Sequence, residues 1–279
     1  MKTKKMLTCK DFTVSGENFD LLYDEQLDML ITSPKPTLEK LPEYYKSEDY
    51  ISHTDAKRGI FEKMYHAVKQ IALKQKLQYV NIENPEKGKL LDIGAGTGDF
   101  LLTAKNDKWQ VSGVEPNLKA QELAQKKSIT LKEDLSFYNN EQFDVITMWH
   151  VLEHVPNLEA HIAHLKKLLA KNGTIFIAVP NFKSWDAHYY KEFWAAYDVP
   201  RHLWHFSQNA IKTLFAKNEL KVVKMIPMKF DAFYVSLLSE KYKTGKMNFV
   251  KGFFNGLKSN NTAKRNSEYS SLIYVIKNN

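Results

Sequence analysis

The stretch Leu90-Leu91-Asp92-Ile93-Gly94-Ala95-Gly96-Thr97-Gly98-Asp99-Phe100 decides the fold of this 279-residue chain. An apolar run with one acid leads into three glycines at alternate positions, and a second apolar run follows. This pattern predicts a buried strand that ends in a tight turn and opens a helix. Glycines in such a turn let the backbone approach a ligand that a Cβ would exclude. The G-x-G-x-G spacing differs from the G-x-G-x-x-G of dinucleotide-binding folds, which disfavours a nicotinamide dehydrogenase.

Two later segments extend the pattern. Val111-Ser112-Gly113-Val114-Glu115 predicts a short strand that ends in an acid, about 20 residues after the glycine loop, where nucleoside-binding α/β folds grip a ribose diol. A carboxylate can accept two hydroxyl hydrogen bonds at once, so Glu115 is the candidate ribose ligand. The segment 143–150 predicts another strand, and 151–157 follows it. The sequence therefore predicts a nucleoside site at the ends of parallel strands.

At these residues the chain resembles the class I S-adenosylmethionine-dependent methyltransferases. The stretches LLDIGAGTGDF (90–100), VSGVEP (111–116) and FDVITMWHVLEHVPN (143–157) are similar to that family's first, second and fourth motifs, in the same order and spacing. The resemblance covers roughly residues 85–230 and is nearest to small-molecule enzymes. It implies an α/β, Rossmann-like, doubly wound fold with a seven-stranded, mostly parallel sheet whose last strand is antiparallel.

Strand and helix patterns alternate beyond the glycine loop, as a parallel sheet with helices on both faces requires. The expected helices are 55–79, 100–105, 118–127 and 158–171, the last with Asn172-Gly173 as its C-cap. The expected further strands are 129–132, 174–179, 220–225 and 271–276, and residues 255–268 read as a flexible loop.

The N-terminal part divides at a Pro-Lys-Pro segment. Residues 1–36 suggest short strands near 19–29 and 30–32. Residues 37–84 are expected to form a helical lid. Residues 85–279 are expected to form the cofactor domain, with a substrate-side insertion around 181–255. In many relatives of the resembled type a cysteine-rich zinc ribbon precedes the Pro-x-Pro segment. Here Cys9 is the only cysteine, and structural zinc normally needs four ligands. We therefore expect a degenerate ribbon without metal.

Composition narrows the class of protein. Apolar residues make up 43% and charged residues 26%, as in a soluble globular protein, and no apolar run approaches a membrane span. The basic segment 1–11 lacks the apolar core of a secretion signal, which favours a cytoplasmic protein. We expect a monomer or homodimer. The net charge is +8, with much of the excess between Lys212 and Arg265. That excess indicates either attraction to nucleic acid, anionic lipid or an acidic substrate, or simply a solvated lysine-rich surface.

The resemblance assigns cofactor contacts to residues at the strand tips. Asp92 orients the glycine loop, and Asp134 and Leu135 match the place where the family contacts the adenine. The expected ligands of S-adenosyl-L-methionine are Asp92, Gly94, Gly96, Gly98, Glu115, Asp134, Leu135 and His150.

Three histidines are candidates for the methyl-transfer chemistry, because a base is needed when the acceptor must lose a proton. His150 lies at the tip of the fourth strand and His154 one helical turn later, while His202 belongs to DVPRHLWHFS (198–207), which is similar to a segment common in this group. Structural roles compete at each position, including a loop before a helix capped by Ser207. The expected substrate contacts are Tyr45, Arg201 and Trp204, with Tyr44, Tyr50 and His53 in the lid.

The sequence thus predicts an S-adenosylmethionine-dependent methyltransferase that acts on oxygen or carbon of a small molecule, with no stable nucleic-acid partner. Two alternatives stay open. A nucleic-acid (RNA) methyltransferase would suit the basic charge, but Thr147-Met148-Trp149-His150 does not match the Asn/Asp-Pro-Pro-aromatic turn of base N-methylating enzymes. A non-catalytic cofactor-binding protein is disfavoured by the intact glycines and Glu115.

Overall fold

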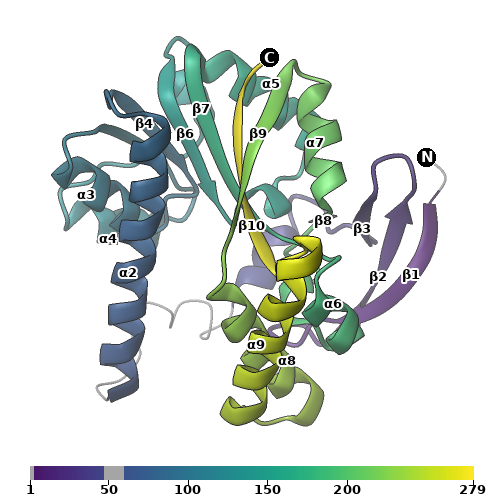
Figure 1. Cartoon of the computed structure of the whole chain (residues 1–279). Coiled ribbons are helices and arrows are strands. Elements are labelled where there is room, and N and C mark those ends of the chain that lie inside the picture. Colours follow the sequence, from purple (N-terminus) through teal and green to yellow (C-terminus); the bar gives the residue numbers. More distant parts are fainter. Residues whose placement is uncertain (1–2, 47–59) are drawn as a thin grey trace.

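The computed structural model describes residues 3–46 and 60–279, and side chains in the first helix from Lys69 onward. Figure 1 shows a central sheet flanked by helices, with a small N-terminal sheet to one side and a helical hairpin below. In the described part of the chain, no helix is both long and apolar enough to cross a membrane.

The central sheet has six strands in the order β5-β4-β6-β7-β10-β9. They are β4 (Lys89–Ile93), β5 (Gln110–Val114), β6 (Phe143–Trp149), β7 (Leu169–Pro180), β9 (Leu220–Pro227) and β10 (Ser271–Asn278). β5, β4, β6 and β7 pair in parallel, and β10 lies antiparallel to both of its neighbours. The expected α/β sheet with an antiparallel last strand is confirmed.

The strand expected at 129–132 is the exception, so the prediction of seven strands was one too high for the described residues. Only Lys132 bridges to the sheet edge, opposite Val114. Asp134 then caps the short helix η2 (Leu135–Tyr138), which turns the chain away from the sheet after a single pair. The residues at the expected place lie at the sheet edge without forming a strand.

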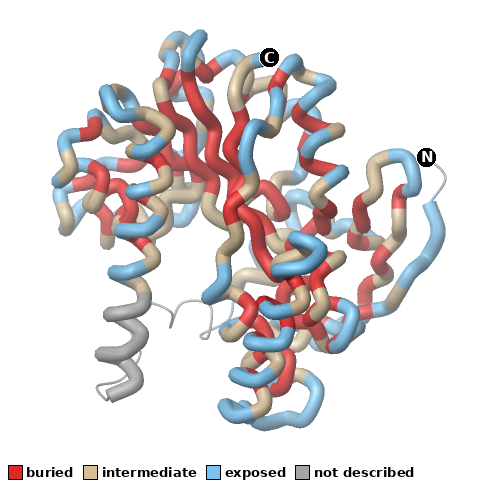
Figure 2. Tube along the Cα trace, viewed as in Figure 1, coloured by how far each residue is buried: buried red, intermediate tan, exposed pale blue. Residues whose placement is uncertain are grey.

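Helices cover both faces of the central sheet because the strand side chains alternate in direction. Leu91 and Ile93 point into one core, together with α5 (Leu158–Leu168) and α7 (Gln208–Ala216). Leu90 points into the other, with the three helices α2 (Ile60–Glu83), α3 (Asp99–Asn106) and α4 (Leu118–Gln125). Figure 2 shows the buried strands between these layers. The long helix expected at 55–79 corresponds to α2, and residues 55–59 lie outside the described part.

The expected C-cap at Asn172-Gly173 is wrong. Helix α5 ends at Leu168, and both residues lie within β7. The buried side chain of Leu169 and its pairing with Phe143 place the start of the strand here, earlier than the polar Lys171-Asn172 pair suggests.

The N-terminal residues form a second, antiparallel sheet with a strand from the cofactor domain. β1 (Thr3–Lys10), β2 (Asn18–Asp24) and β3 (Met29–Ser33) pair in sequence, and β3 pairs with β8 (Trp204–Phe206). The sequence pattern missed β1. Cys9 is buried in this unit, and burial raises the pKa of its thiol to about 12, so it stays protonated at neutral pH. The absence of ribbon metal stays a prediction.

The loop expected at 255–268 is a helix. α9 (Phe249–Asn266) packs on α8 (Asp231–Thr244), and the glycines of α9 allow the close approach. A Cβ on Gly256 would stand 2.8 Å from the Cα of Phe233. The polar residues that suggested a loop are bonded inside: Ser259 donates to Asp186 at 2.6 Å and Asn260 to the carbonyl of Lys229 at 2.9 Å.

Shorter helices connect these elements on the substrate side of the chain. They are η1 (Leu41–Tyr45), η3 (Leu152–His154), α6 (Trp185–Tyr190), η4 (Lys191–Phe193) and η5 (Ala195–Tyr197).

Ser207 connects the N-terminal sheet with helix α7, and its substitution tests this connection. Its Oγ accepts from the backbone N of Ala210 at 3.0 Å as the N-cap of α7, and donates to the carbonyl of Asp28 at 2.7 Å. We expect Ser207→Ala to lower the free energy of unfolding by about 2 kcal/mol, because the cap of α7 and a part-buried bond to the turn before β3 are both lost. Asn157→Ala removes only the exposed cap of α5 and should cost about 1 kcal/mol. Equal losses in denaturant titrations would contradict the joining role.

Candidate active site

The glycine loop leaves open space at the carboxyl end of β4. Gly94, Gly96 and Gly98 all have positive φ, between 53° and 73°. At Gly94 a Cβ would clash with Val151 at 2.5 Å, so that glycine serves packing. At Gly96 nothing lies within 4 Å of the place that a Cβ would take, and Gly98 precedes the first turn of α3. A ligand can therefore approach the backbone at Gly96.

Glu115 holds this loop against the neighbouring strand. It directly follows β5, and its carboxylate accepts from the backbone N of Gly96 at 2.8 Å and of Asn117 at 2.9 Å. Gln121 donates to the backbone carbonyl of Glu115 at 2.6 Å. The carboxylate is thus fixed beside the open space at Gly96. Its predicted bonds to a ribose remain a prediction.

Asp92 lies within β4, one residue before the last, and is buried. Thr147 on the neighbouring strand donates to it at 2.6 Å. Burial raises the pKa of Asp92 to about 7, although the Thr147 bond and the nearby charge of Lys76 act in the opposite direction. The acid behind the loop can therefore change its charge near neutral pH.

Lys76 on α2 is a residue that sequence reasoning missed. Its Nζ lies 4.7 Å from the centre of the Trp149 ring, a cation–π contact. Burial lowers the pKa of Lys76, and the charges of Asp231 and Asp92 oppose that shift. The helical pattern assigned the lysines of this segment to the solvent face, so no signal in the sequence set Lys76 apart. Among the residues that the structure describes, none is a hydrogen-bond partner for the buried Nε1 of Trp149.

Asp134 and Leu135 lie at the start of η2, beyond the end of β5. Asp134 is exposed and accepts from the backbone N of Ser136 at 2.7 Å, which makes it the N-cap of this helix. The pKa of Asp134 is lowered first by a hydrogen bond with the side chain of Ser136 and then by this backbone bond. Leu135 is half-buried and packs against the core. Their contact with an adenine stays a prediction.

His150 follows β6 with a left-handed φ of 59°. Its Nε2 lies 3.1 Å from Asp231 at the start of α8, and its Nδ1 lies 3.5 Å from Glu153. Burial disfavours the charged imidazole, but the two carboxylates outweigh it and raise the pKa of His150 to about 9. His150 is therefore protonated at neutral pH. Asp231, its closest partner, was not found from the sequence because about 80 residues separate the two.

Glu153, His154 and His202 meet beside His150. Glu153 is fully buried, and its two carboxylate oxygens lack hydrogen-bond partners in the described part of the chain. The Nδ1 of His154 donates to the carbonyl of Arg201 at 3.0 Å, and that of His202 donates to the carbonyl of Ala196 at 2.9 Å. A neutral imidazole bonded in this way keeps a lone pair on Nε2.

Burial, aided by the neighbouring His202, lowers the pKa of His154 to about 4. His154 is therefore neutral across the physiological range. One ligand atom each from Glu153, His154 and His202 lies within 4.8 Å of the others, a spacing that could also hold a metal ion. The sequence assigned none of these residues to a metal.

The three expected substrate residues take different places. Tyr45 reaches the cluster, because its hydroxyl lies 3.0 Å from Nδ1 of His154. Trp204 donates to the carbonyl of Val155 at 2.7 Å, and the Nζ of Lys35 lies 3.1 Å from its ring centre. Burial lowers the pKa of that lysine to about 8.

Arg201 is almost fully buried and bonds within the protein. It donates to Asp198 at 2.7 and 3.0 Å, to Asp11 at 3.0 Å and to the carbonyl of Tyr44 at 2.9 Å. A clamp on a substrate anion, as expected from the sequence, would require these bonds to break. Tyr44 itself donates to Glu17. The lid residues Tyr50 and His53 lie outside the described residues.

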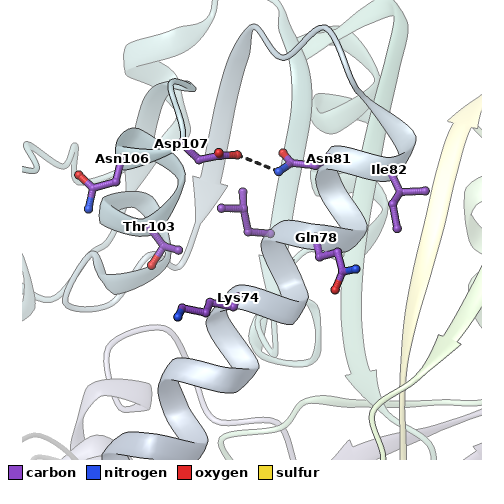
Figure 3. A pocket seen from close by; sticks show the side chains of 8 residues that line it. Lys74, Gln78, Asn81, Ile82, Thr103, Asn106 and Asp107 are labelled. Atoms are coloured by element: carbon purple, nitrogen blue, oxygen red, sulfur yellow. Dashed lines mark hydrogen bonds between the residues drawn. The ribbon is translucent and has the colours of Figure 1, made fainter.

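A separate concavity of about 480 Å³ lies between α2 and α3 (Figure 3). Its lining includes Lys74, Gln78 and Thr103, and Asn81 donates to Asp107 across it. None of the expected cofactor or substrate residues lines this concavity. The strand-tip site is therefore a different place on the molecule.

A family model described as a methyltransferase domain matches residues 61–225, more than half of the chain. The chain belongs to this methyltransferase family. The match confirms the resemblance to class I methyltransferases, since it spans the glycine loop, Glu115 and the His150–His154 segment.

Curated relatives of this methyltransferase include two ubiquinone biosynthesis O-methyltransferases. The one from Pasteurella multocida is 31% identical over 118 residues, which cover 35% of this chain and 49% of the relative. The one from Haemophilus ducreyi is 30% identical over 146 residues, which cover 43% of this chain and 62% of the relative. The methyltransferase thus spans about half the length of the first relative and under two thirds of the second.

Solved structures share the fold at low identity. Magnesium protoporphyrin IX methyltransferase from Synechocystis, with bound S-adenosylhomocysteine, aligns with a TM-score of 0.58 and 14% identity, over 87% of this chain and 100% of that one. A possible histamine N-methyltransferase from Thermotoga maritima aligns with a TM-score of 0.53 and 18% identity, and the alignment covers 78% of this chain and 95% of that one. At these identities the likeness concerns the fold.

The charge on His150 predicts how stability depends on pH. The pKa of His150 is about 9 in the folded state, against 6.5 for the free side chain. This protonation therefore stabilises the fold fully below pH 6.5, and the contribution is lost as the pH rises through 9. About a third of the side chain is exposed, so screening by solvent reduces the contribution. We expect Asp231→Asn to lower the free energy of unfolding by about 1 kcal/mol near pH 6 and by much less near pH 9.5.

The matched control is Asp20→Asn, which removes an exposed carboxylate whose partner is Lys5. This pair contains no histidine, so the control should lose the same small amount at both pH values. A loss for Asp231→Asn that does not change with pH would contradict the charged pair with His150.

Proposed function

We propose that the chain is an S-adenosylmethionine-dependent methyltransferase that transfers a methyl group to oxygen or carbon of a small molecule. The observation that carries the proposal is the open space at Gly96, bordered by the fixed carboxylate of Glu115. A Cβ would fill this space, so the backbone there suits a ligand that approaches closely. The names of the O-methyltransferase relatives support oxygen as the acceptor atom.

The strand-tip residues fit the parts of the cofactor. Glu115 would accept from the ribose hydroxyls, and Asp134 with Leu135 would contact the adenine. The methionine end carries an ammonium and a carboxylate, and the site offers a charge for each. Asp92 suits the ammonium, while Lys76 and the unpaired Nε1 of Trp149 suit the carboxylate.

S-adenosylmethionine, when bound, supplies a methyl group that is already activated by a positively charged sulfur. The protein must then align the acceptor, exclude water and remove a proton from an acceptor hydroxyl. His150 is charged at neutral pH, so it fits an electrostatic and positioning role and not that of a base. His154 and His202 remain for the proton, which would pass to Nε2 of one of them and be stabilised there by buried Glu153. Tyr45 would orient His154 and contact the acceptor.

The methionine end gives a binding test with an internal control. Glu115→Ala should weaken both S-adenosylhomocysteine and methylthioadenosine about 10-fold or more in calorimetry, because both carry the ribose. Lys76→Met should weaken S-adenosylhomocysteine by a similar factor and leave methylthioadenosine, which has no carboxylate, unchanged. Lys74→Met, on an exposed turn of the same helix, is the matched control. Normal binding by Glu115→Ala would remove the ribose assignment.

The proton acceptor can be tested without a known acceptor molecule. Purified protein and methyl-labelled S-adenosylmethionine are incubated with a small-molecule extract, and labelled products are counted by mass spectrometry. We expect His202→Gln and His154→Gln to lower transfer at least about 100-fold, as loss of a general base does, with cofactor affinity retained. His164→Gln, on α5, is the control and should behave as wild type.

A metal-assisted reaction would involve the same residues. Loss of transfer after treatment with a chelator, with recovery on addition of one divalent cation, would make Glu153, His154 and His202 ligands in place of a base. Unchanged transfer after the chelator supports the base. Salt-dependent transfer of label to RNA instead of the extract would favour the nucleic-acid alternative.

A further inference from the structure

The hairpin of α8 and α9 is packed with its apolar side outward. The face of α9 toward α8 carries Gly252 and Gly256, where added Cβ atoms would stand 3.0 Å from the Cα of Leu237 and 2.8 Å from the Cα of Phe233. Small residues bring the two helices close together. The large apolar side chains of α9 therefore have no room between the helices and lie toward its outer side. Phe253 also stacks on Phe233 of α8, with 5.4 Å between the ring centres, and stays more than half exposed.

These outward side chains form one stripe. Val250, Phe253, Phe254 and Leu257 follow the i, i+3, i+4, i+7 spacing of a single helix face. Their exposed fractions lie between 39% and 68%, and Met247 in the connecting turn is 45% exposed. Figure 2 shows these turns of the hairpin as exposed. A contiguous exposed patch of this kind marks an interaction surface.

The charge around the stripe is entirely positive on its outer side. Seven basic and two acidic residues fall between Asp231 and Asn266. Both acids turn inward: Asp231 pairs with His150, and fully buried Glu240 accepts from Tyr190 at 3.0 Å. Glu240 also pairs with Lys251 at 3.3 Å, so the charge of that lysine is compensated within the hairpin. The basic residues are Lys241, Lys243, Lys246, Lys251, Lys258, Lys264 and Arg265.

We propose that this hairpin binds the surface of an anionic lipid bilayer, with the stripe of α9 inserted among the lipids. A helix with lysines beside an aromatic and aliphatic face lies in the plane of a membrane interface, and each lysine near an anionic surface adds to the attraction. The proposal does not depend on the methyl-transfer assignment, because none of the proposed cofactor ligands lies in the stripe.

Two other occupants fit the surface less well. Nucleic acid would stack on phenylalanines, but Val250, Leu257 and Met247 offer no flat ring for a base. A second copy of the chain would bring two positive surfaces together, and like charges in an interface are costly. An anionic bilayer satisfies the aliphatic, aromatic and positive parts of the surface together.

The hairpin also joins this surface to the strand tips. α8 begins at Asp231, whose carboxylate lies 3.1 Å from His150. The same two-helix unit, which lies below the central sheet in Figure 1, therefore carries a residue of the candidate site at one end and the exposed stripe on α9. A bilayer bound at the stripe would hold the site close to the lipid surface.

The test is co-sedimentation of the full-length protein with vesicles. We expect binding to phosphatidylcholine vesicles that contain about 30% phosphatidylglycerol, and little binding to pure phosphatidylcholine. The double change Phe253→Ser and Phe254→Ser should weaken binding about 10-fold or more. Ile82→Ser, which alters an equally exposed apolar residue on α2, should bind as wild type.

Charge is tested separately. Lys243→Gln with Lys246→Gln should weaken binding several-fold, whereas Lys217→Gln with Lys221→Gln, outside the hairpin, should not. About 0.5 M salt should weaken wild-type binding through screening of the lysines. Circular dichroism and retained binding of S-adenosylhomocysteine check that each variant is folded.

Three results would overturn the proposal. The first is no preference for phosphatidylglycerol vesicles, and the second is unchanged binding after the Phe253/Phe254 change. The third is a dimer in light scattering, or RNA binding in fluorescence anisotropy, that is lost in that variant while vesicle binding is not. Each would assign the stripe to another partner or to none.

Discussion

One buried cation holds the parts of the candidate site together. The guanidinium of Arg201 joins Asp11 after β1, the backbone of η1 at Tyr44 and the insertion at Asp198, and its own carbonyl accepts from His154. Removing one partner from such a network would leave a buried charge without compensation, which is far more costly than the loss of a surface pair. His202 follows Arg201 directly, so its position depends on the same bonds. The N-terminal sheet, η1 and the segment around Asp198 are thus fixed relative to one another by charge as well as by apolar packing.

The features that could be predicted from the sequence are those that residues close together in the chain determine. The glycine loop, the strand ending in Glu115 and the cap at Ser207 are local patterns, and the structure has each of these elements. Lys76 and Asp231 could not be found in this way, because their role comes from folding distant segments against the strand tips. The prediction of a loop at 255–268 fails for a related reason: this segment is rich in Asn, Lys and Ser, and the contact of α9 with α8 explains why it forms a helix. The adenine and ribose contacts depend on a ligand and remain predictions.

Two histidines four residues apart are held in opposite charge states. The pKa of His150 is raised to about 9 by two carboxylates, while that of His154 is lowered to about 4, first by burial and then by the neighbouring His202. The same residue type therefore provides a cation and a neutral acceptor side by side at one pH. Pairs of titratable groups whose environments push their pKa values apart are common where proton transfer takes place. Glu153 lies next to both and can respond to a proton that arrives at either.

The pairing of β3 with β8 has a consequence for how this chain can change over time. β8 lies within the insertion that carries His202, yet it completes the sheet begun by the first 33 residues. Each of the two strands depends on the other, since its backbone N–H and C=O groups would be unpaired if its partner were absent. The two segments therefore vary as one unit despite the distance between them in sequence. An exchange of the N-terminal region between family members would succeed only when the partner strand is exchanged with it.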